Sequence, residues 1–313
     1  MTPIRVGSIE IVRIQESCEP AAPPALLPSL PPSALEDNRD WLSPTFFDFA
    51  TQRFVFSTHT WLIRTPRYTV LFELGAGNGK HRPNFPRAHM LTTPWLDRLA
   101  AAGVKPRDVD FVVASHLHTD HVGWFTSLEG SQWVPTFPNA KYLIPKLEFD
   151  NWTPGKRTTP VPAFNEGVIE DSVLPVVAAG QVELVEEGHQ IDSDLAMLPA
   201  RGHTIGHIAL LAGSGSESAV LSGDIAYSPL QFVYPSVNAY ADEDMDAAII
   251  TRKNILDRCA ESNCLLLPSH FADPYSAVRI GRSKNGYIIR SVAGETIAES
   301  LPMQLPAEPA SSQ

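Results

Sequence analysis

The segment SHLHTDHVGW, residues 115–124, contains three histidines and one aspartate within six consecutive positions. The chain has only 10 histidines among its 313 residues, so this segment is strongly enriched in them. Imidazole nitrogens and carboxylate oxygens are common metal ligands in proteins. The spacing His-x-His-x-Asp-His therefore predicts a metal-binding segment that contains His116, His118, Asp120 and His121.

The spacing within this segment divides the ligands between two metal ions. His116 and His118 are two residues apart, so in an extended loop their rings point to the same side and can bind one ion. Asp120 and His121 follow where the chain turns into the next element, which lets them face a second ion. We therefore expect further ligands downstream, at the ends of other strands.

Three polar residues downstream each follow an apolar stretch that is typical of a strand. His203 comes after LAMLPA, Asp224 after SAVL and His270 after CLLL, each beside small residues that allow a sharp turn. This layout places all the candidate ligands along one edge of a sheet. The predicted ligand set for the two ions consists of three histidines, a mixed group and a bridging carboxylate: His116, His118 and His203; Asp120, His121 and His270; and Asp224.

A site of this kind leaves coordination positions open for water, which is typical of catalytic rather than structural metal ions. Two cations that share a water lower its pKa from about 16 to about 7, so a metal-bound hydroxide is available at neutral pH. Asp120 is expected to orient this nucleophile as well as to bind metal. Zinc is the expected metal, and such His/Asp sites also accept manganese, cobalt or iron.

The elements that must position these residues alternate between strands and helices. The sequence predicts an antiparallel hairpin over residues 53–65 and 68–74, a helix over 92–103 and a buried strand over 109–115. Downstream, short strands alternate with turns, and a helix is predicted at about 242–260. This pattern favours an α/β body built in layers.

The first 50 residues differ in composition from the rest of the chain. Residues 18–50 are rich in proline but also carry leucine, tryptophan and phenylalanine, so we expect an extended arm that lies on the body or on a partner subunit. The predicted organisation is an N-terminal strand and Pro-rich arm over residues 1–52, a domain that carries the candidate ligands over 53–300 and a frayed tail over 301–313.

Composition excludes several classes of partner. The net charge of −11 and the absence of a local Lys/Arg cluster argue against binding to nucleic acid or to an anionic membrane surface. No apolar run is long enough to span a bilayer, and the N-terminus has no apolar region of the kind found in secretory signals. Three cysteines without CxxC spacing indicate reduced thiols, so we expect a cytoplasmic protein that binds a small molecule, with a homodimer as its expected assembly.

Four motifs carry a resemblance to a known family: SHLHTDHVGW, FPNAKYLIPKLEFDNW, GHTIGH and SGDIAY. Together they resemble the metallo-β-lactamase superfamily over residues 53 to 290. The resemblance implies an αββα sandwich with the metal site at one edge, and hydrolysis as its chemistry. Within the superfamily the motifs are most similar to lactonases that open acyl-homoserine lactones and to methyl-parathion-type organophosphate hydrolases. A lactone is therefore the first expected substrate and a phosphotriester the second.

Two residues extend or depart from the family pattern. Tyr227 follows Asp224 by three residues and resembles the tyrosine of the homoserine-lactone lactonases, which implies that its phenol donates a hydrogen bond to the oxyanion. The family usually has an aspartate in a DTG context where this chain has Glu73 in FELGAG. A carboxylate there is suited to supporting a metal-bound histidine through its other ring nitrogen.

Alternative readings of the same residues remain open. A hydrolytic dehalogenase or a thioesterase would use the same ions on another bond, whereas a diiron redox protein would carry a carboxylate in place of His118. Trp124, Phe47 and Phe271 are candidates for an apolar substrate pocket, with Trp124 first because it follows the histidine segment, although aromatic residues more often belong simply to the core. His207, four residues after His203, is expected to support a ligand or the fold rather than to bind metal.

Overall fold

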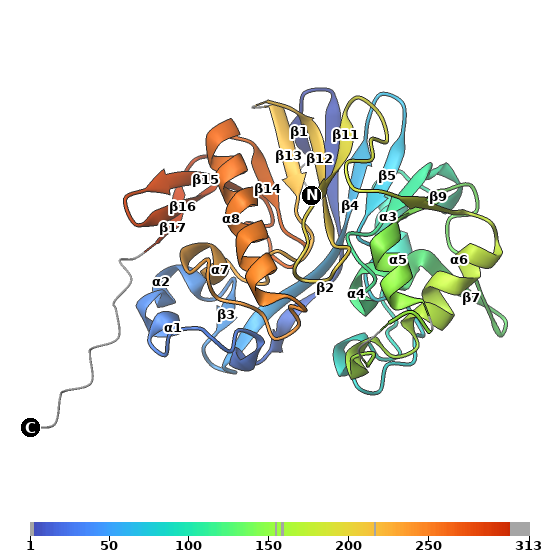
Figure 1. Cartoon of the computed structure of the whole chain (residues 1–313), viewed down its shortest axis with the longest axis horizontal. Coiled ribbons are helices and arrows are strands. Elements are labelled where there is room, and N and C mark those ends of the chain that lie inside the picture. The colour runs from blue at the N-terminus through green and yellow to red at the C-terminus, as the bar shows by residue number, and fades with distance from the viewer. Residues whose placement is uncertain (1–2, 154, 158–159, 216, 301–313) are drawn as a thin grey trace, which may run out of the picture.

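Two β-sheets pack face to face in the computed structural model, and helices cover both outer faces (Figure 1). The structure describes residues 3–153, 155–157, 160–215 and 217–300. The tail predicted over residues 301–313 lies outside these described residues. The order of layers is helix, sheet, sheet, helix, as the family resemblance implies.

The first sheet has eight strands and changes from antiparallel to parallel pairing along its width. Its neighbours run in the order β1-β2-β4-β5-β6-β9-β10, with β3 paired to β4. Pairing is antiparallel from β1 to β5 and parallel from β5 to β10. The strands are β1 (Ile4–Val6), β2 (Ile9–Ala22), β3 (Phe47–Asp48), β4 (Arg53–Arg64), β5 (Thr69–Phe72), β6 (Phe111–Val113), β9 (Lys141–Pro145) and β10 (Val182–Val185).

The second sheet has seven strands that follow one another in chain order. Only β13 and β14 pair in parallel, because α8 separates them in the chain. The strands are β11 (Leu195–Pro199), β12 (Ile208–Ser214), β13 (Glu217–Leu221), β14 (Leu265–Leu267), β15 (Val278–Ser283), β16 (Gly286–Ser291) and β17 (Thr296–Glu299). A separate hairpin consists of β7 (Thr126–Glu129) and β8 (Gln132–Pro135).

Most helices are short and connect one strand to the next. The longest, α8, begins after Asp244, whose side chain accepts a hydrogen bond from the backbone N–H of Ala247 and so caps the helix. The α-helices are α1 (Ala34–Asp37), α2 (Arg39–Leu42), α3 (Trp95–Ala101), α4 (Thr119–Val122), α5 (Lys146–Trp152), α6 (Leu174–Ala178), α7 (Leu230–Val233) and α8 (Met245–Ser262). Single turns of other helix types are η1 (Pro24–Leu26), η2 (Pro86–Ala88), η3 (Pro106–Asp108), η4 (Gly123–Phe125), η5 (Ala163–Asn165) and η6 (Ile169–Val173).

The apolar side chains form three buried clusters that match the layers. One lies between the two sheets and joins residues such as Trp61 and Phe72 of the first sheet to Leu210 and Leu221 of the second. A second lies between the first sheet and the helices that include α3, and a third lies under α8. Because both faces of each sheet are covered, the central strands are buried along nearly their whole length, as in β4.

The predicted elements that carry the site are confirmed, with shifts of a few residues at their ends. The hairpin is β4–β5, the helix predicted over 92–103 is α3, the buried strand is β6, and the helix predicted at about 242–260 is α8. Among the described residues, the structure has no helix that combines the length and the apolar character needed to cross a bilayer.

The N-terminal segment differs from the extended arm predicted over residues 18–50. Strand β2 runs to Ala22 and pairs with β4 across the boundary predicted at residue 52. The chain then forms three short helices, and its apolar residues, including Leu42 and Phe46, are buried in the cluster under α8. The described part of this segment is therefore a component of the sandwich, because its apolar side chains are too numerous to remain in water.

Candidate metal centre

The seven predicted ligands lie together at one edge of the sandwich, because each follows the end of a strand. His116 and His118 lie in the loop after β6, and Asp120 and His121 lie on the short helix α4 that follows. The other three come from the second sheet: His203 follows β11, Asp224 follows β13 and His270 follows β14. The structure thus brings together all seven residues singled out in the sequence, from both sheets.

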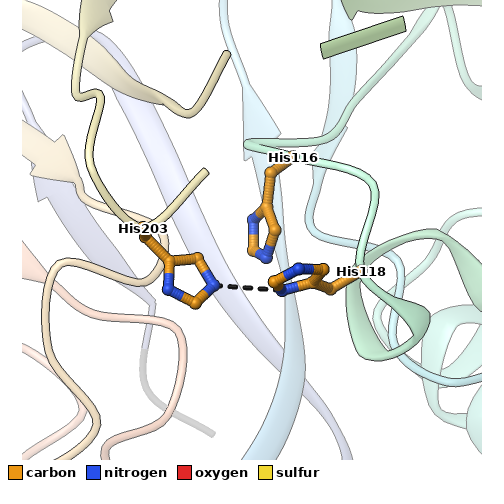
Figure 2. A group of neighbouring side chains, drawn as sticks. All are labelled: His116, His118 and His203. Atoms are coloured by element: carbon orange, nitrogen blue, oxygen red, sulfur yellow. Dashed lines mark hydrogen bonds between the residues drawn. The ribbon is translucent and has the colours of Figure 1, made fainter. Parts of the chain in front are cut away.

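His116, His118 and His203 form a compact group, in which ligand atoms from each residue lie within 4.8 Å of one another. Figure 2 shows the three rings converging, with His118 Nδ1 3.0 Å from His203 Nε2. All three side chains are buried. This is the group that the sequence assigns to the first ion.

Asp224 lies between the two predicted groups. One of its carboxylate oxygens, Oδ2, is 3.3 Å from His121 Nε2 and 3.6 Å from His203 Nε2, while Oδ1 is 3.0 Å from His270 Nε2. Two further groups within the same 4.8 Å limit are formed by His116, His121 and Asp224, and by Asp120, His121 and His270. The position of Asp224 fits the bridging role expected for it.

Protein groups outside the set bind the ring nitrogens that face away from its centre. His203 Nδ1 donates to Asp242 Oδ1 at 3.0 Å, and His270 Nδ1 donates to the backbone carbonyl of Ser57 at 2.9 Å. The Nε2 atom of each ring therefore faces the centre, where it can bind a metal ion when it carries no proton. Such contacts fix the orientation and tautomer of a metal-binding histidine.

This arrangement of acceptors tests whether the residues fit a metal ion. His270 Nε2 lies 3.0 Å from the Asp224 carboxylate, a contact that requires a cation, either a proton on the ring nitrogen or a metal ion bound by both groups. Among the described residues, His116 Nε2, His121 Nε2 and Asp224 Oδ1 are buried without a hydrogen-bond partner. The donor set is all imidazole and carboxylate, which suits zinc and other divalent transition metals. The residues present therefore fit divalent metal ions.

Glu73, which departs from the family pattern, contacts a predicted ligand directly. Its Oε2 atom lies 2.9 Å from His121 Nδ1, and its other oxygen accepts a hydrogen bond from Ser269 at 3.2 Å. The residue has a φ of 63°, in the left-handed region, so the chain turns sharply there and directs the carboxylate to the site. The glutamate side chain, which is longer than that of the usual aspartate, thus contacts the outer ring nitrogen of His121, as the sequence suggested.

Electrostatics in this buried cluster favour a positive ion. Burial alone lowers the pKa of His121, but the carboxylates of Asp224 and Glu73 outweigh it and raise that pKa well above its ordinary value. Asp224 shows the opposite balance: burial raises its pKa, and the charges of His121 and His270 hold it well below the ordinary value. The Asp224 carboxylate therefore carries negative charge at neutral pH and attracts cations to the site.

Glu148 is a buried carboxylate that the sequence did not single out. It accepts hydrogen bonds from the backbone N–H groups of Leu117 at 3.1 Å and Gly206 at 3.0 Å, and from the Thr204 hydroxyl at 2.9 Å. Leu117 lies between two of the predicted ligands, and Thr204 follows a third. Glu148 therefore ties the loop after β6 to the loop after β11. A lone glutamate in a helical stretch gives no signal of this role in the sequence.

His207 supports the fold, as expected. Its Nε2 atom accepts the backbone N–H of Asp224 at 3.0 Å, and its Nδ1 donates to the carbonyl of Ala200 at 2.7 Å. Burial lowers the pKa of His207 to about 3, so the ring stays neutral and keeps both bonds. It fixes the backbone of Asp224 and has no nitrogen left for a metal ion.

A cavity of about 830 Å³ opens onto the cluster. Its floor includes His118, Asp120 and Tyr227, and residues 19–26 of β2 and η1 contribute seven of its lining residues. Four aromatic side chains form the remaining apolar wall: Phe56, Phe85, Phe164 and Tyr240. The cavity is thus a mainly apolar compartment with polar groups gathered at one end.

The three aromatic residues considered for this pocket lie in the core instead, which is the other role that the sequence left open for them. Trp124 is buried behind the histidine segment, where its ring stacks on Trp95 at 5.0 Å and its N–H donates to Glu16. Phe47 and Phe271 lie in the cluster under α8. Proximity in sequence to the histidines was a poor guide, because the chain turns away from the cavity directly after α4.

Tyr227 lies in the cavity beside the predicted ligands. Its hydroxyl is 3.4 Å from His203 Nε2, and its ring stacks on that of His270 with a centroid distance of 5.0 Å and an interplanar angle of 7°. Burial, with the added charge of Asp224, raises the pKa of Tyr227 well above its ordinary value. The phenol therefore keeps its proton and is available as a hydrogen-bond donor.

A family model described as the metallo-beta-lactamase superfamily matches residues 53–257. The chain belongs to this superfamily. The match covers the loop after β6, the loop after β11 and the loop after β13, while β14 and His270 lie beyond it. The resemblance and the fold class predicted from the sequence are both confirmed.

Relatives in this superfamily include lactonases. The N-acyl homoserine lactonase of Bacillus cereus is 24% identical over 163 residues, which are 52% of this chain and 55% of that protein. The N-acyl homoserine lactonase AttM of Agrobacterium fabrum is 36% identical over 55 residues, 18% of each chain. The matched segment thus spans about half the length of the first of these relatives and less of the second.

Solved structures share the fold over nearly the whole chain. The hydrolase AbOPH of the beta lactamase superfamily has a TM-score of 0.76 at 22% identity, covering 93% of this chain and 96% of its own. The dizinc quorum-quenching lactonase AidC, in complex with a product, has a TM-score of 0.72 at 20% identity and covers 97% and 98%. At these identities the likeness establishes a common fold.

Proposed function

We propose that the protein is a metal-dependent hydrolase that opens lactones carrying an apolar substituent. The observation that carries this proposal is the position of the seven-residue cluster at the floor of a mainly apolar cavity. The lactonase relatives support the choice of a lactone. A phosphotriester is the second substrate class, since attack at phosphorus makes similar demands on the site.

The cluster is proposed to hold two divalent cations, with zinc as the expected metal. His116, His118 and His203 would hold one, Asp120, His121 and His270 the other, and Asp224 would contact both. When bound, such cations acidify a water molecule and polarise the carbonyl group of an ester. The dizinc content of AidC supports this assignment by analogy of fold alone.

The chain's own residues then have distinct roles in ring opening. Asp120 has one carboxylate oxygen 3.7 Å from His121 Nε2, where it can orient the attacking water by accepting a hydrogen bond. As water adds to the carbonyl carbon, negative charge develops on the carbonyl oxygen, and the Tyr227 phenol donates a hydrogen bond to it. The ring C–O bond breaks, the leaving oxygen takes one proton of the attacking water to become a hydroxyl group, and the other proton of that water passes to solvent. The product is a hydroxy acid in its carboxylate form.

The walls of the cavity favour an apolar group on the substrate. Alanine, proline and phenylalanine side chains bury apolar surface of a ligand and offer it no side-chain hydrogen bonds. The lactone ring is therefore proposed to lie at the floor with its substituent along residues 19–26. A cytoplasmic location and a homodimer stay predictions.

Metal counting and a substrate panel test this function together. We expect two ions per chain, fastest turnover on lactones with an apolar substituent, loss of activity with chelator and recovery when zinc is returned. The panel includes phosphotriesters, thioesters, aryl esters and halogenated aromatics. Fully active protein with one ion or none would refute the two-metal site. Turnover confined to another substrate class would overturn the lactone assignment.

A further inference from the structure

Arg87 is a cavity residue that lies outside the predicted ligand set. It belongs to η2, in the loop between β5 and α3, and its side chain lines the cavity. Its Nη2 atom donates to Asp120 Oδ2 at 2.6 Å, and the side chain is 20% exposed. Arg87 therefore places a positive charge beside the reacting end of the cavity.

Aromatic stacking fixes the orientation of this guanidinium. Its central carbon lies 3.4 Å from the centre of the Phe56 ring and 4.7 Å from that of Phe85. Phe56 in turn packs on His270, with ring centroids 4.0 Å apart. Stacked in this way, an arginine loses little further freedom when it binds a ligand.

The guanidinium has more donors than its protein partner uses. It carries five N–H bonds in a planar fork, and within the described residues the structure records one hydrogen bond from this side chain, to Asp120. The other cation that lines the cavity, Arg53, is exposed and donates to the carbonyl of Ala21. Arg87 is thus the lining cation that contacts a predicted ligand.

We propose that Arg87 binds the carboxylate that ring opening creates, and so is a substrate-binding residue of this site. The inference rests on the proposed lactone hydrolysis, in which a neutral ester becomes an anion beside Asp120. A planar guanidinium matches a carboxylate through paired N–H···O bonds. The carbonyl group of the neutral lactone binds the same N–H donors less tightly than a carboxylate does. Arg87 therefore contributes more to the binding of the product than to the binding of the substrate.

Calorimetric binding to the metal-loaded protein tests this without turnover. The probes are ring-opened N-hexanoyl-homoserine, which has a carboxylate, and its uncharged primary amide. We expect Arg87→Met to weaken binding of the carboxylate at least tenfold and binding of the amide less than threefold, with metal content unchanged. Arg87→Lys keeps the charge and should recover part of the carboxylate affinity. Arg67→Met is the matched control, because Arg67 also stacks on an aromatic ring, that of Tyr68, and contacts a carboxylate, that of Asp192, but does not line the cavity; it should change neither probe more than threefold.

Each other result overturns the inference. An equal loss of affinity for both probes would show that Arg87 only packs against the ligand. A loss of bound metal would show that Arg87 acts indirectly, by positioning Asp120. If Arg87→Met does not fold, Arg87→Lys still tests the inference. A lysine variant that binds the amide and the carboxylate as tightly as wild type would contradict recognition of the carboxylate by a planar guanidinium. Failure of the proposed function is distinguishable, since it appears as wild-type protein that opens no lactone.

Discussion

The floor and the walls of the cavity are built in different ways. At the floor, ring nitrogens that face outward are bonded to a further buried group, such as Asp242 for His203 or the Ser57 carbonyl for His270. The walls consist of small and aromatic side chains, such as Ala25 and Phe164, which contribute shape and apolar surface. Under the proposed function, we expect the floor to determine the chemistry and to tolerate little substitution, and the walls to select the substrate and to tolerate more.

The largest effect is expected from Asp224→Ala at the floor. This change removes the carboxylate that lies within 4.0 Å of nitrogens of four histidines, so metal binding and turnover should fall by more than the roughly 100-fold typical of lost supporting residues. Elemental analysis and steady-state rates measure it. Asp246→Ala, an exposed aspartate of α8, is the control and should behave as wild type. Full turnover with two bound metals would show that Asp224 is not the bridge.

Glu73→Gln tests whether a residue that contacts a predicted ligand from outside the set is needed for metal binding. The amide keeps the shape but loses the charge that faces His121 Nδ1 at 2.9 Å, so metal affinity should fall by about 10 to 100-fold. Competition with a chelator measures that affinity. Glu16→Gln is a matched buried change, since Glu16 accepts from Ala76, Gly77 and Trp124 and from no histidine. Equal metal affinity in the two variants would contradict the role given to Glu73.

Tyr227→Phe lies at the boundary between floor and wall. It deletes only the hydroxyl and keeps the ring stacked on His270, so Tm and metal content should stay at wild-type values. The loss of one oxyanion donor typically costs on the order of 100-fold in turnover, and we expect kcat to fall at least tenfold with little change in KM. Tyr240→Phe, the same change at an exposed lining residue, is the control. An unchanged kcat would reduce Tyr227 to packing.

The smallest effect is expected at the wall, from Ala25→Trp. A large ring on η1 occupies cavity volume without touching the floor, so kcat/KM should fall several-fold for lactones with long substituents and stay near wild type for short ones. A chain-length series measures the change. Ala100→Trp on the exposed side of α3 is the control. A uniform loss across the series would mean that the wall does not select for length.

The floor was far more predictable from sequence than the walls. His116, His118, Asp120 and His121 are close in the chain, and their spacing alone indicates a common purpose. Isolated ligands such as His270 could be found because each follows an apolar strand, and strand ends meet at one edge. The structure brings these residues together, while their roles as ligands stay predictions.

The walls and supports could not be predicted because they have no local pattern. Arg87 and Glu148 are single charged residues, and their contacts with the site, from Arg87 to Asp120 and from Glu148 to Leu117 and Gly206, span 33, 31 and 58 positions of the chain, so no spacing identifies them. The N-terminal segment was predicted as an arm, since its prolines hide the pairing of β2 with β4. A cavity wall made of alanine and proline carries no chemical signature in a sequence.

The division of the site between the two sheets also has a consequence for how the protein is made. His118 and His203 are 85 positions apart in the chain, and His270 follows only after β14. During translation, the loop after β6 therefore leaves the ribosome before the residues that complete the cluster. A nascent chain that ends before residue 270 carries only part of the predicted ligand set. The first predicted group is complete once His203 has been made, whereas the second also needs His270, so protein truncated before β14 is expected to lack the second group.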